Sequence, residues 1–253
     1  MVQALKNPYS DNNWLRADHR DNWLARFDRR GPGPLPVISS GSSAIDRLLP
    51  EGGLRRGSLV EWLGDGLGSG VSLFPLMTIC NLQEQGGKVV VVDRQQRFYP
   101  PAAAAAGIDL ARTIVVRPTT EPDELWAIEQ ALRCGEVAAV LAWPDRLDSF
   151  VFHRLQLAVE EHGSLGLLVR PAGALRQPRC AEVRLLVSPR TGSLTWRWNV
   201  QLLRAGGHFA QGQVDVELQP HDDSSHVSAS CPAPIYRTVV SSMATSATCG
   251  QTA

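Results

Sequence analysis

The chain has 253 residues, of which 43% are hydrophobic and 20% charged, and its formal net charge is zero. These values favour one globular domain with irregular ends and exclude a general electrostatic attraction to nucleic acid. Five scattered cysteines without a C-x-x-C pair argue against a zinc site or disulfide framework, and they fit reduced thiols in a cytoplasm. No apolar run reaches the ~20 residues of a membrane helix, and residues 1–10 lack the apolar stretch of a secretory signal.

Residues 1–36 form the first predicted unit, an amphipathic segment followed by a Pro/Gly linker. Leu15, Trp23 and Phe27 fall roughly on one helical face among many charged residues. The linker Gly31–Pro36 contains three prolines and two glycines, which exclude regular structure. Two interpretations stay open: the segment packs its aromatics on the main domain, or it docks another protein.

Residues 37–218 form the predicted core, in which apolar strands alternate with amphipathic helices. A short helix is expected to begin at Ser42 or Ser43. Apolar runs then predict strands at 58–63, 88–93, 113–117, 137–143 and 165–170, and periodic apolar residues predict helices at 72–85, 100–106, 121–134 and 149–162. The buried stripe of helix 72–85 is expected to be Leu73, Leu76, Met77, Cys80 and Leu82. Continuous β-branched strands such as 88–93 are typical of parallel sheets covered on both faces.

The pattern changes after residue 181, where strands are expected at 182–188, 194–199 and 214–218. The first two are joined by a hairpin-like turn, so they are antiparallel. From residue 219 the chain is rich in Ser, Thr, Ala, His and Pro, and residues 219–253 are predicted to be a mostly disordered tail. The predicted fold class is therefore α/β, a mostly parallel sheet flanked by helices, with antiparallel strands at the C-terminal end.

A glycine-rich loop with the layout of a phosphate-binding loop follows strand 58–63. Its candidate anion-binding residues are Gly64, Gly66, Gly68, Gly70 and Ser72. The working pattern is G-x-x-x-x-G-K-[ST], and when Ser72 takes the last position the Lys position holds Val71. We interpret the loop as a degenerate phosphate loop that does not function. Weak anion binding by its backbone stays open, because amide donors survive the loss of the Lys.

The order of these pieces resembles the RecA recombinase family. The resemblance rests on Ile38–Asp46, Gly52–Glu61, the glycine loop, the strand ending at Asp93 and Ala181–Leu185, and it spans roughly residues 37–217. It therefore implies a RecA-like P-loop core. It also implies that the water-activating Glu is replaced by Gln95 and the metal-positioning Asp by Trp143, with Asp145 two residues on. An amide cannot take a proton, so no catalytic residue and no metal site are expected, and ATP is not expected as a cofactor.

Several side chains near these motifs have two interpretations. Arg176 and Arg179 lie in the short connection between strands 165–170 and 182–188, where the resemblance would place a DNA-binding loop. They either belong to a solvated turn or make a residual contact with nucleic-acid phosphate. Trp62, Trp126, Trp196 and Trp198 are interpreted as core or sheet-face residues, whereas Trp143 is expected to fill space where a metal and nucleotide would sit.

A degenerate RecA-like chain with an aromatic N-terminal segment also resembles the ImuA family of mutasome accessory proteins. That resemblance implies a cytoplasmic, non-catalytic adaptor in SOS-type DNA damage tolerance, that is, translesion synthesis and induced mutagenesis. The implied partners are RecA, a Y-family-like mutasome protein and an error-prone polymerase, with no membrane partner. Two alternatives stay open: a SulA-like cell-division inhibitor, and an ATP-binding recombinase-like protein in which Arg94 supplies the missing cation.

Overall fold

The computed structural model describes residues 36–64, 69–177, 181–190, 196–206, 208–220 and 236–240. Its centre is a nine-stranded sheet with the strand order β11-β10-β9-β8-β3-β7-β6-β4-β5. The predicted N-terminal unit, residues 1–36, lies outside the described residues except for Pro36. Within the described part of the chain, no helix has the length and apolar character needed to cross a membrane.

Six neighbouring strands are parallel and form the larger part of the sheet. They are β3 (Leu59–Gly64), β4 (Lys88–Val92), β5 (Thr113–Val116), β6 (Val137–Ala142), β7 (Leu165–Pro171) and β8 (Val183–Pro189). Each was expected from a short apolar run, and their bounds differ from the predicted ones by only one or two residues. Because all six point the same way, their carboxyl ends meet at one edge, where ligands of open α/β sheets bind.

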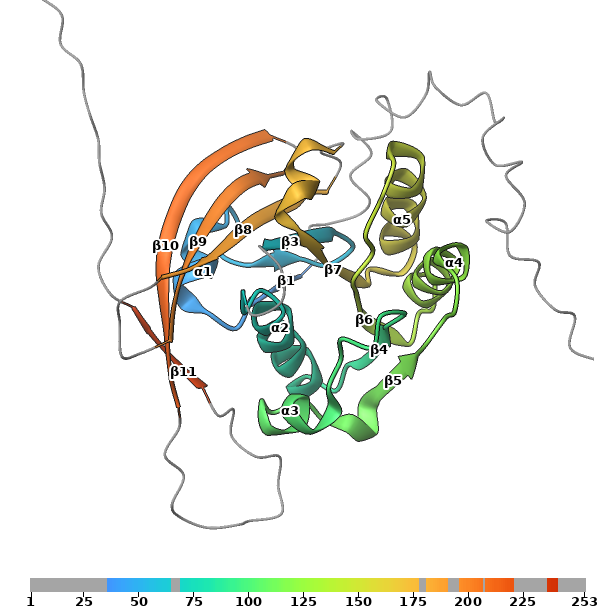
Figure 1. The fold of residues 1–253 in the computed structure, drawn as a ribbon, viewed down its shortest axis with the longest axis horizontal. Helices are drawn as coiled ribbons and strands as arrows, with labels where there is room; N and C mark the ends of the chain where they lie inside the picture. The colour runs from blue at the N-terminus through green and yellow to red at the C-terminus, as the bar shows by residue number, and fades with distance from the viewer. Residues whose placement is uncertain are drawn as a thin grey trace, which may run out of the picture.

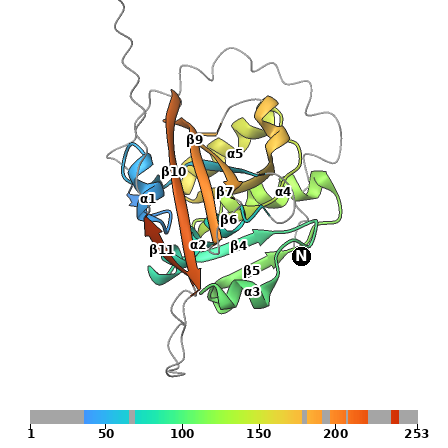
Figure 2. The ribbon, with the colours of Figure 1, turned by 60° about the vertical axis from the view of Figure 1, so that its left-hand side comes forward.

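Three antiparallel strands extend the sheet beyond β8 and confirm the predicted fold class. They are β9 (Trp196–Ala205), β10 (His208–Pro220) and β11 (Tyr236–Val240). In Figure 2, β9 and β10 run at a steep angle to β4 and β5, because the sheet twists from one edge to the other. β9 and β10 are much longer than predicted. β11 lies inside the segment that was expected to be mostly disordered, and it pairs with β10.

The helices cover both faces of the parallel strands, as Figure 1 shows. α1 (Ser43–Leu48), α2 (Leu73–Glu84) and α3 (Pro100–Ala105) contribute to one apolar cluster, and α4 (Glu121–Leu132) and α5 (Ser149–His162) to the other. Along β4, Val89 and Val91 belong to the first cluster and Val90 and Val92 to the second. This alternation explains the continuous Val run, since both faces of the strand are buried. The short elements are β1 (Val37–Ile38), β2 (Leu54–Arg55), η3 (Leu110–Arg112) and η4 (Ala172–Arg176).

Local capping explains where the longer helices begin and end. The Thr120 hydroxyl accepts a hydrogen bond of 3.2 Å from the Asp123 amide at the start of α4, and Asp148 accepts one of 2.8 Å from the Val151 amide at the start of α5. α5 ends at Gly163, whose φ of 72° is the left-handed conformation common after helices. Ser42 precedes α1, as expected, but its side chain makes no capping hydrogen bond.

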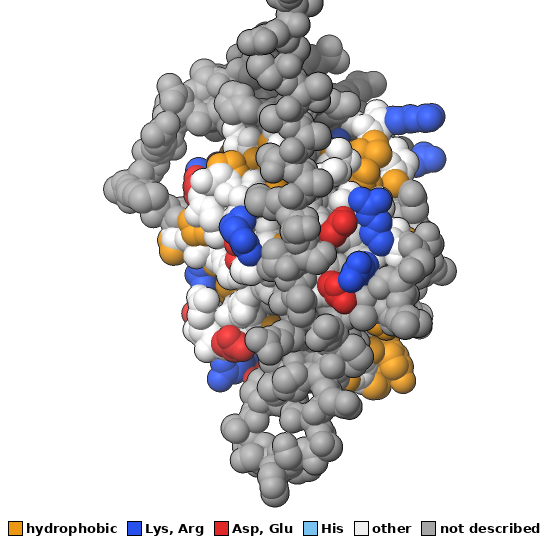
Figure 3. Space-filling view, turned by 90° about the vertical axis from the view of Figure 1, so that its left-hand side faces the viewer, with side chains coloured by type: hydrophobic (Ala, Val, Ile, Leu, Met, Phe, Trp, Pro, Cys, Tyr) orange, Lys and Arg blue, Asp and Glu red, His pale blue; other side chains and the backbone are white. Residues whose placement is uncertain are grey.

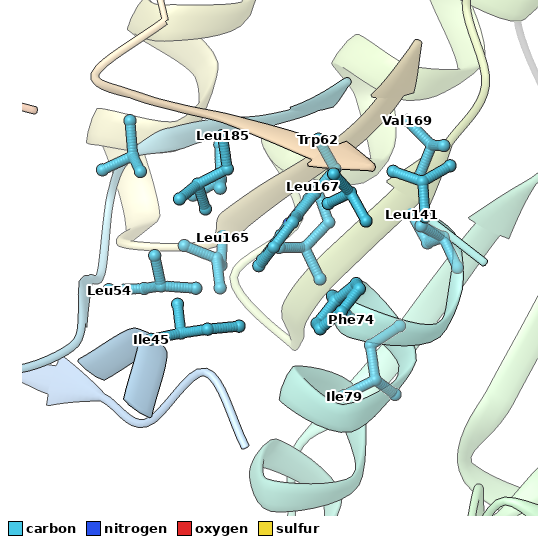
Figure 4. Packing of buried hydrophobic residues seen from close by; sticks show 14 of the residues in the cluster. Ile45, Leu54, Trp62, Phe74, Ile79, Leu141, Leu165, Leu167, Val169 and Leu185 are labelled. Atoms are coloured by element: carbon cyan, nitrogen blue, oxygen red, sulfur yellow. The ribbon is translucent and has the colours of Figure 1, made fainter. Parts of the chain in front are cut away.

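The core between α2 and the sheet is built around aromatic packing. Figure 4 shows Trp62 of β3 beside Phe74 of α2, with ring centroids 5.5 Å apart in a stacked arrangement. The predicted stripe of α2 was correct only for Cys80 and Leu82, which are buried. Phe74, Thr78 and Ile79 are also buried, whereas Leu73, Leu76 and Met77 are only half-buried. Thr78 tolerates burial because its hydroxyl donates to the Ser40 carbonyl at 3.0 Å.

The outer face of β9 and β10 is polar and carries paired charges. Arg197 of β9 contacts Glu217 of β10 at 2.8 Å, and the Asn199 amide donates to Asp215 at 2.7 Å. Acidic and basic side chains accordingly lie beside one another on the side of the molecule that Figure 3 shows. The two strands alternate polar and apolar residues, which is typical of an antiparallel sheet with one solvated face.

Candidate functional site: a closed phosphate loop

The turn after β3 keeps the strand-to-helix arrangement of a phosphate-binding loop. β3 ends at Gly64, and Ser69 and Gly70 lead to Ser72, the residue that precedes α2. The Leu73 amide donates to the Gly70 carbonyl at 3.0 Å, which closes a tight turn. Gly66 and Gly68 lie outside the described residues. The structure therefore brings Gly64, Gly70 and Ser72 together, as the sequence predicts.

Val71, at the Lys position, packs inward. Its side chain is buried, and a Cβ added at Gly64 would lie only 2.7 Å from the Val71 Cβ. Gly64 therefore serves a close approach between strand and loop. An ammonium at position 71 would be placed among apolar atoms rather than at a bound phosphate, and burying such a charge is costly.

Trp143 closes the loop from β6. It follows Ala142, the last residue of that strand, and only 3% of its surface is exposed. Its indole N–H donates a hydrogen bond of 3.1 Å to the Ser72 hydroxyl. In a working loop this hydroxyl holds Mg²⁺, but here a bulky indole occupies its surroundings.

Trp198 of β9 closes the loop from the other side. Its indole N–H donates to the Ser69 carbonyl at 2.8 Å. Gly70 has a φ of 73°, and a Cβ there would lie 2.4 Å from the Trp198 Nε1. Trp198 was expected only as a core or sheet-face residue. Its contact with the loop has no local sequence signal, because residues 69 and 198 are far apart in the chain.

Trp198 also joins an aromatic row that runs from the core to the surface. Phe74 meets Trp198 edge to face, with centroids 5.9 Å apart, and Trp198 stacks on Trp196 at 6.2 Å. Trp196 is 67% exposed. Packing on both sides fixes Trp198 in place, so its hydrogen bond to Ser69 restrains the loop.

A second polar group lies at the same edge of the sheet, after β4. The Gln95 amide donates to Asp145 at 2.6 Å. Arg94 contacts Glu124 at 2.7 Å and Asp145 at 3.1 Å. Arg94 was the cation that the ATP-binding alternative required, and the structure shows it held by two carboxylates.

Glu124 is the most buried acid of this group. Burial raises the pKa of its carboxyl, because desolvation disfavours the charged form, while the hydrogen bond from Arg94 acts in the opposite direction. The hydrogen bond to Glu124 in turn raises the pKa of Arg94. These groups form an ion-paired network in which Arg94 engages Oε2 of Glu124, while the buried Oε1 has no hydrogen-bond partner among the described residues.

Beneath the loop, three charged side chains lie in the middle of the sheet. Glu61 of β3 contacts Arg170 of β7 at 2.5 Å and Arg184 of β8 at 2.8 Å, and all three are at least 98% buried. This cluster was not predicted from the sequence. The available signal was one charged residue inside each of three apolar strand runs, which calls for a partner because buried charges are rarely left alone.

Two arginines remain among the candidate residues. Arg176 is exposed at the end of η4, and Arg179 lies outside the described residues. No group of three or more His, Cys, Asp or Glu side chains within the described ranges could hold a metal ion. With Val71 buried, Ser72 bonded to Trp143 and Gly70 against Trp198, these residues do not fit Mg²⁺–ATP held as in a working phosphate loop.

Comparison with known proteins places the chain among RecA-like proteins. The family model of the RecA N-terminal domain matches residues 26–146. The chain is 33% identical over 118 residues to Protein RecA of Streptomyces venezuelae, which covers 47% of this chain and 31% of that protein. Protein RecA of Acidothermus cellulolyticus is 31% identical over 123 residues, covering 49% of this chain and 35% of that protein.

A second relative matches a larger share of the chain. The chain is 35% identical over 171 residues to Protein ImuA of Caulobacter vibrioides (strain NA1000 / CB15N). The alignment covers 65% of this chain and 68% of that protein. The resemblance inferred from the order of the sequence motifs is thereby confirmed, and the chain belongs to the ImuA family and has a RecA-like core.

Proposed function

We propose that this protein is a non-catalytic RecA-like adaptor in DNA damage tolerance, acting in the cytoplasm through protein partners. Family membership supports the process, and the closed phosphate loop supports the absence of catalysis. In this proposal the partners are RecA, a Y-family-like mutasome protein and an error-prone polymerase of the SOS-induced translesion pathway. The RecA-like core then serves as a scaffold for binding rather than as a motor.

The observation that carries this proposal is the hydrogen bond of 3.1 Å from Trp143 to Ser72. Phosphoryl transfer depends on positioned cations and on a group that orients the nucleophile. Here the cation position holds buried Val71, the metal-binding hydroxyl accepts from an indole, and the base position holds Gln95. Three separate requirements of the reaction are lost together, so restoring one of them would not restore turnover.

Titration calorimetry with Mg²⁺–ATP tests the loss of catalysis on the purified chain, on Val71→Lys and on Val71→Lys/Trp143→Asp. We expect no binding heat from the wild type or from Val71→Lys, because Trp143 still fills the site. The double variant also removes the indole, so we expect weak Mg²⁺–ATP binding from this variant alone. Micromolar binding or ATP hydrolysis by the wild type would contradict the proposal and favour the ATP-binding alternative.

Binding measurements with purified partners test the adaptor role separately. The chain, labelled at a terminus, is titrated with RecA, with the polymerase and with the Y-family-like protein, with and without ATP. We expect saturable binding to at least one of them that does not depend on nucleotide. Binding to none of these, together with binding to a tubulin-like division protein, would favour the cell-division alternative instead.

A further inference from the structure

Arg170 lies at the centre of a contact set that fixes two loops at the carboxyl edge of the sheet. Its Nη1 donates to Glu61 at 2.5 Å, deep in the sheet. Its Nη2 donates to the backbone carbonyl of Asp145, at 3.5 Å, and to the side-chain oxygen of Gln177. One buried guanidinium therefore joins the loop after β6 to the segment after β7.

Arg184 fixes the same segment at a second point. Its Nη2 donates to the Ala174 carbonyl at 2.6 Å, within η4, while its Nε lies 2.8 Å from Glu61. The stretch from Ala174 to Gln177 is thus held by two buried arginines that share one carboxylate. Such contacts restrict backbone motion, because a displaced loop would leave buried donors without acceptors.

The residues next to these fixed points are two exposed arginines. Arg146 follows Asp145, and Arg176 precedes Gln177. Since the Asp145 carbonyl and the Gln177 side chain contact the same nitrogen of Arg170, the two chain segments that carry Arg146 and Arg176 are tied to one guanidinium. In the described part of the chain neither has an ion-pair partner within 4.0 Å.

The nearby carboxylates are already engaged. Asp145 accepts from Arg94 and Gln95, Glu124 accepts from Arg94, and Asp148 accepts from the Val151 amide. Their charges are therefore partly compensated, and the two exposed guanidinium groups give this surface a local positive character. The link between these two loops and the phosphate loop is Trp143, which directly precedes the loop after β6 and bonds to Ser72.

We propose that Arg146 and Arg176 form a docking surface for an acidic segment of a partner protein, with Arg170, Arg184 and Gln177 as positioning residues. This inference rests on the adaptor role proposed above and gives the chemical class of the partner. A guanidinium presents a planar fork of donors that matches a carboxylate in two parallel hydrogen bonds. Because the loops are fixed before binding, little conformational freedom is lost when a partner carboxylate is bound.

An acidic peptide fits this surface better than a nucleic acid. Binding of single-stranded nucleic acid combines a track of positive charge with aromatic side chains that stack on bases. Residues 144–148 and 172–177 contain no aromatic residue, and two arginines beside Asp145 and Asp148 make no continuous track. Charge complementarity therefore favours a short carboxylate-rich segment.

Fluorescence anisotropy tests the proposal on the full chain with a fluorescein-labelled peptide rich in Glu and Asp. We expect saturable binding that weakens with salt. The double variant Arg146→Glu/Arg176→Glu should lose about tenfold or more in affinity. The matched control is Arg47→Glu, which makes the same charge change at an exposed arginine on α1. This variant should bind the peptide like the wild type.

Gln177→Ala tests the positioning role, because it removes the contact with Arg170 without changing any charge. We expect a loss of about threefold in affinity, the size of one hydrogen bond, with unchanged thermal unfolding. A purely electrostatic surface would leave the affinity of Gln177→Ala at the wild-type value, which would overturn the positioning part of the proposal.

Two outcomes would overturn the docking surface itself. Equal losses in the double variant and in Arg47→Glu would mean that binding follows overall charge. Tighter binding of a fluorescein-labelled oligo-dT of equal charge than of the peptide, with loss in the double variant, would assign the surface to nucleic acid. Neither outcome touches the proposed lack of catalysis, which calorimetry with Mg²⁺–ATP tests by itself.

Discussion

The indole N–H of Trp143 donates a hydrogen bond of 3.1 Å to the hydroxyl of Ser72, joining the end of β6 to the start of α2. Both residues stand where a RecA-like enzyme would organise a metal ion. A buried N–H needs an acceptor, and the Ser72 hydroxyl supplies it for Trp143.

Trp143→Phe is expected to destabilise the fold by roughly 1–2 kcal/mol, because it shortens a buried aromatic and removes the bond to Ser72. Urea unfolding measures this change. Ser72→Ala and the double variant complete a mutant cycle, whose coupling energy should be about 0.5–1.5 kcal/mol. A coupling energy near zero would mean that the bond contributes nothing and that Trp143 acts through packing alone.

Gly70→Ala is expected to destabilise the protein more than Gly52→Ala. Both glycines have a φ of 73°, so both substitutions carry about 1 kcal/mol of backbone strain. Only at Gly70 would the new Cβ meet Trp198, whereas nothing lies within 4 Å at Gly52. The excess for Gly70→Ala should be at least about 1 kcal/mol in thermal or urea unfolding.

A shift in tryptophan fluorescence should accompany Gly70→Ala, since Trp198 has to move away from the loop. Equal destabilisation by Gly70→Ala and Gly52→Ala would mean that Trp198 moves away from the new Cβ without a loss of stability. In that case the packing of Trp198 does not restrain the loop.

The order and type of the core elements could be predicted because the parallel strands are short apolar runs with clear breaks. Helix α4 agrees with its prediction because Thr120 caps its start and Leu125, Ile128 and Leu132 form its buried stripe. The face of α2 could not be predicted in the same way, because that helix is apolar on nearly all sides. Two tertiary contacts determine which side of α2 is buried: Phe74 stacks on Trp62, and the Thr78 hydroxyl donates to the Ser40 carbonyl.

The candidate site was predictable only where its residues are close in sequence. The replacement of the Lys by Val71 and of the base by Gln95 could be read from motif positions. Trp198 approaches the loop only because β9 folds back beside β8, and the pairing of Glu61 with Arg170 depends on strand order. Strand β11 was missed because the Ser/Thr-rich tail was judged by its overall composition, although Tyr236–Val240 contains strand-favouring Tyr, Thr and Val and pairs with β10.

Glu61→Gln is expected to destabilise the fold by about 3–5 kcal/mol, because it leaves two buried guanidinium groups without an anion. Denaturant unfolding with both circular dichroism and fluorescence measures the loss. Glu136→Gln breaks the exposed pair with Lys88, at 3.2 Å, and is the surface control, for which less than about 1 kcal/mol is expected. A small loss of stability for Glu61→Gln would mean that water or a loop rearrangement stabilises the buried charges of Arg170 and Arg184.

The stability of the protein should depend on pH through Glu124, whose pKa is raised above its usual 4.5 by burial. A raised pKa means that the folded state binds this proton more tightly than the unfolded state does. Stability therefore falls as pH rises from about 4.5 through the raised pKa, and it is constant above that point. Glu124→Gln removes the titrating group while keeping an acceptor for Arg94.

We expect the free energy of unfolding of the wild type, relative to Glu124→Gln, to decrease as pH rises above 4.5 in urea titrations. Arg94→Gln sharpens the test. Because the hydrogen bond from Arg94 opposes the rise in the pKa of Glu124, its loss should raise that pKa further and extend the decrease to higher pH. A relative stability that increases with pH would mean that attraction to Arg94 outweighs desolvation, so that the pair acts as a net stabilising ion pair within the network that occupies the former catalytic edge.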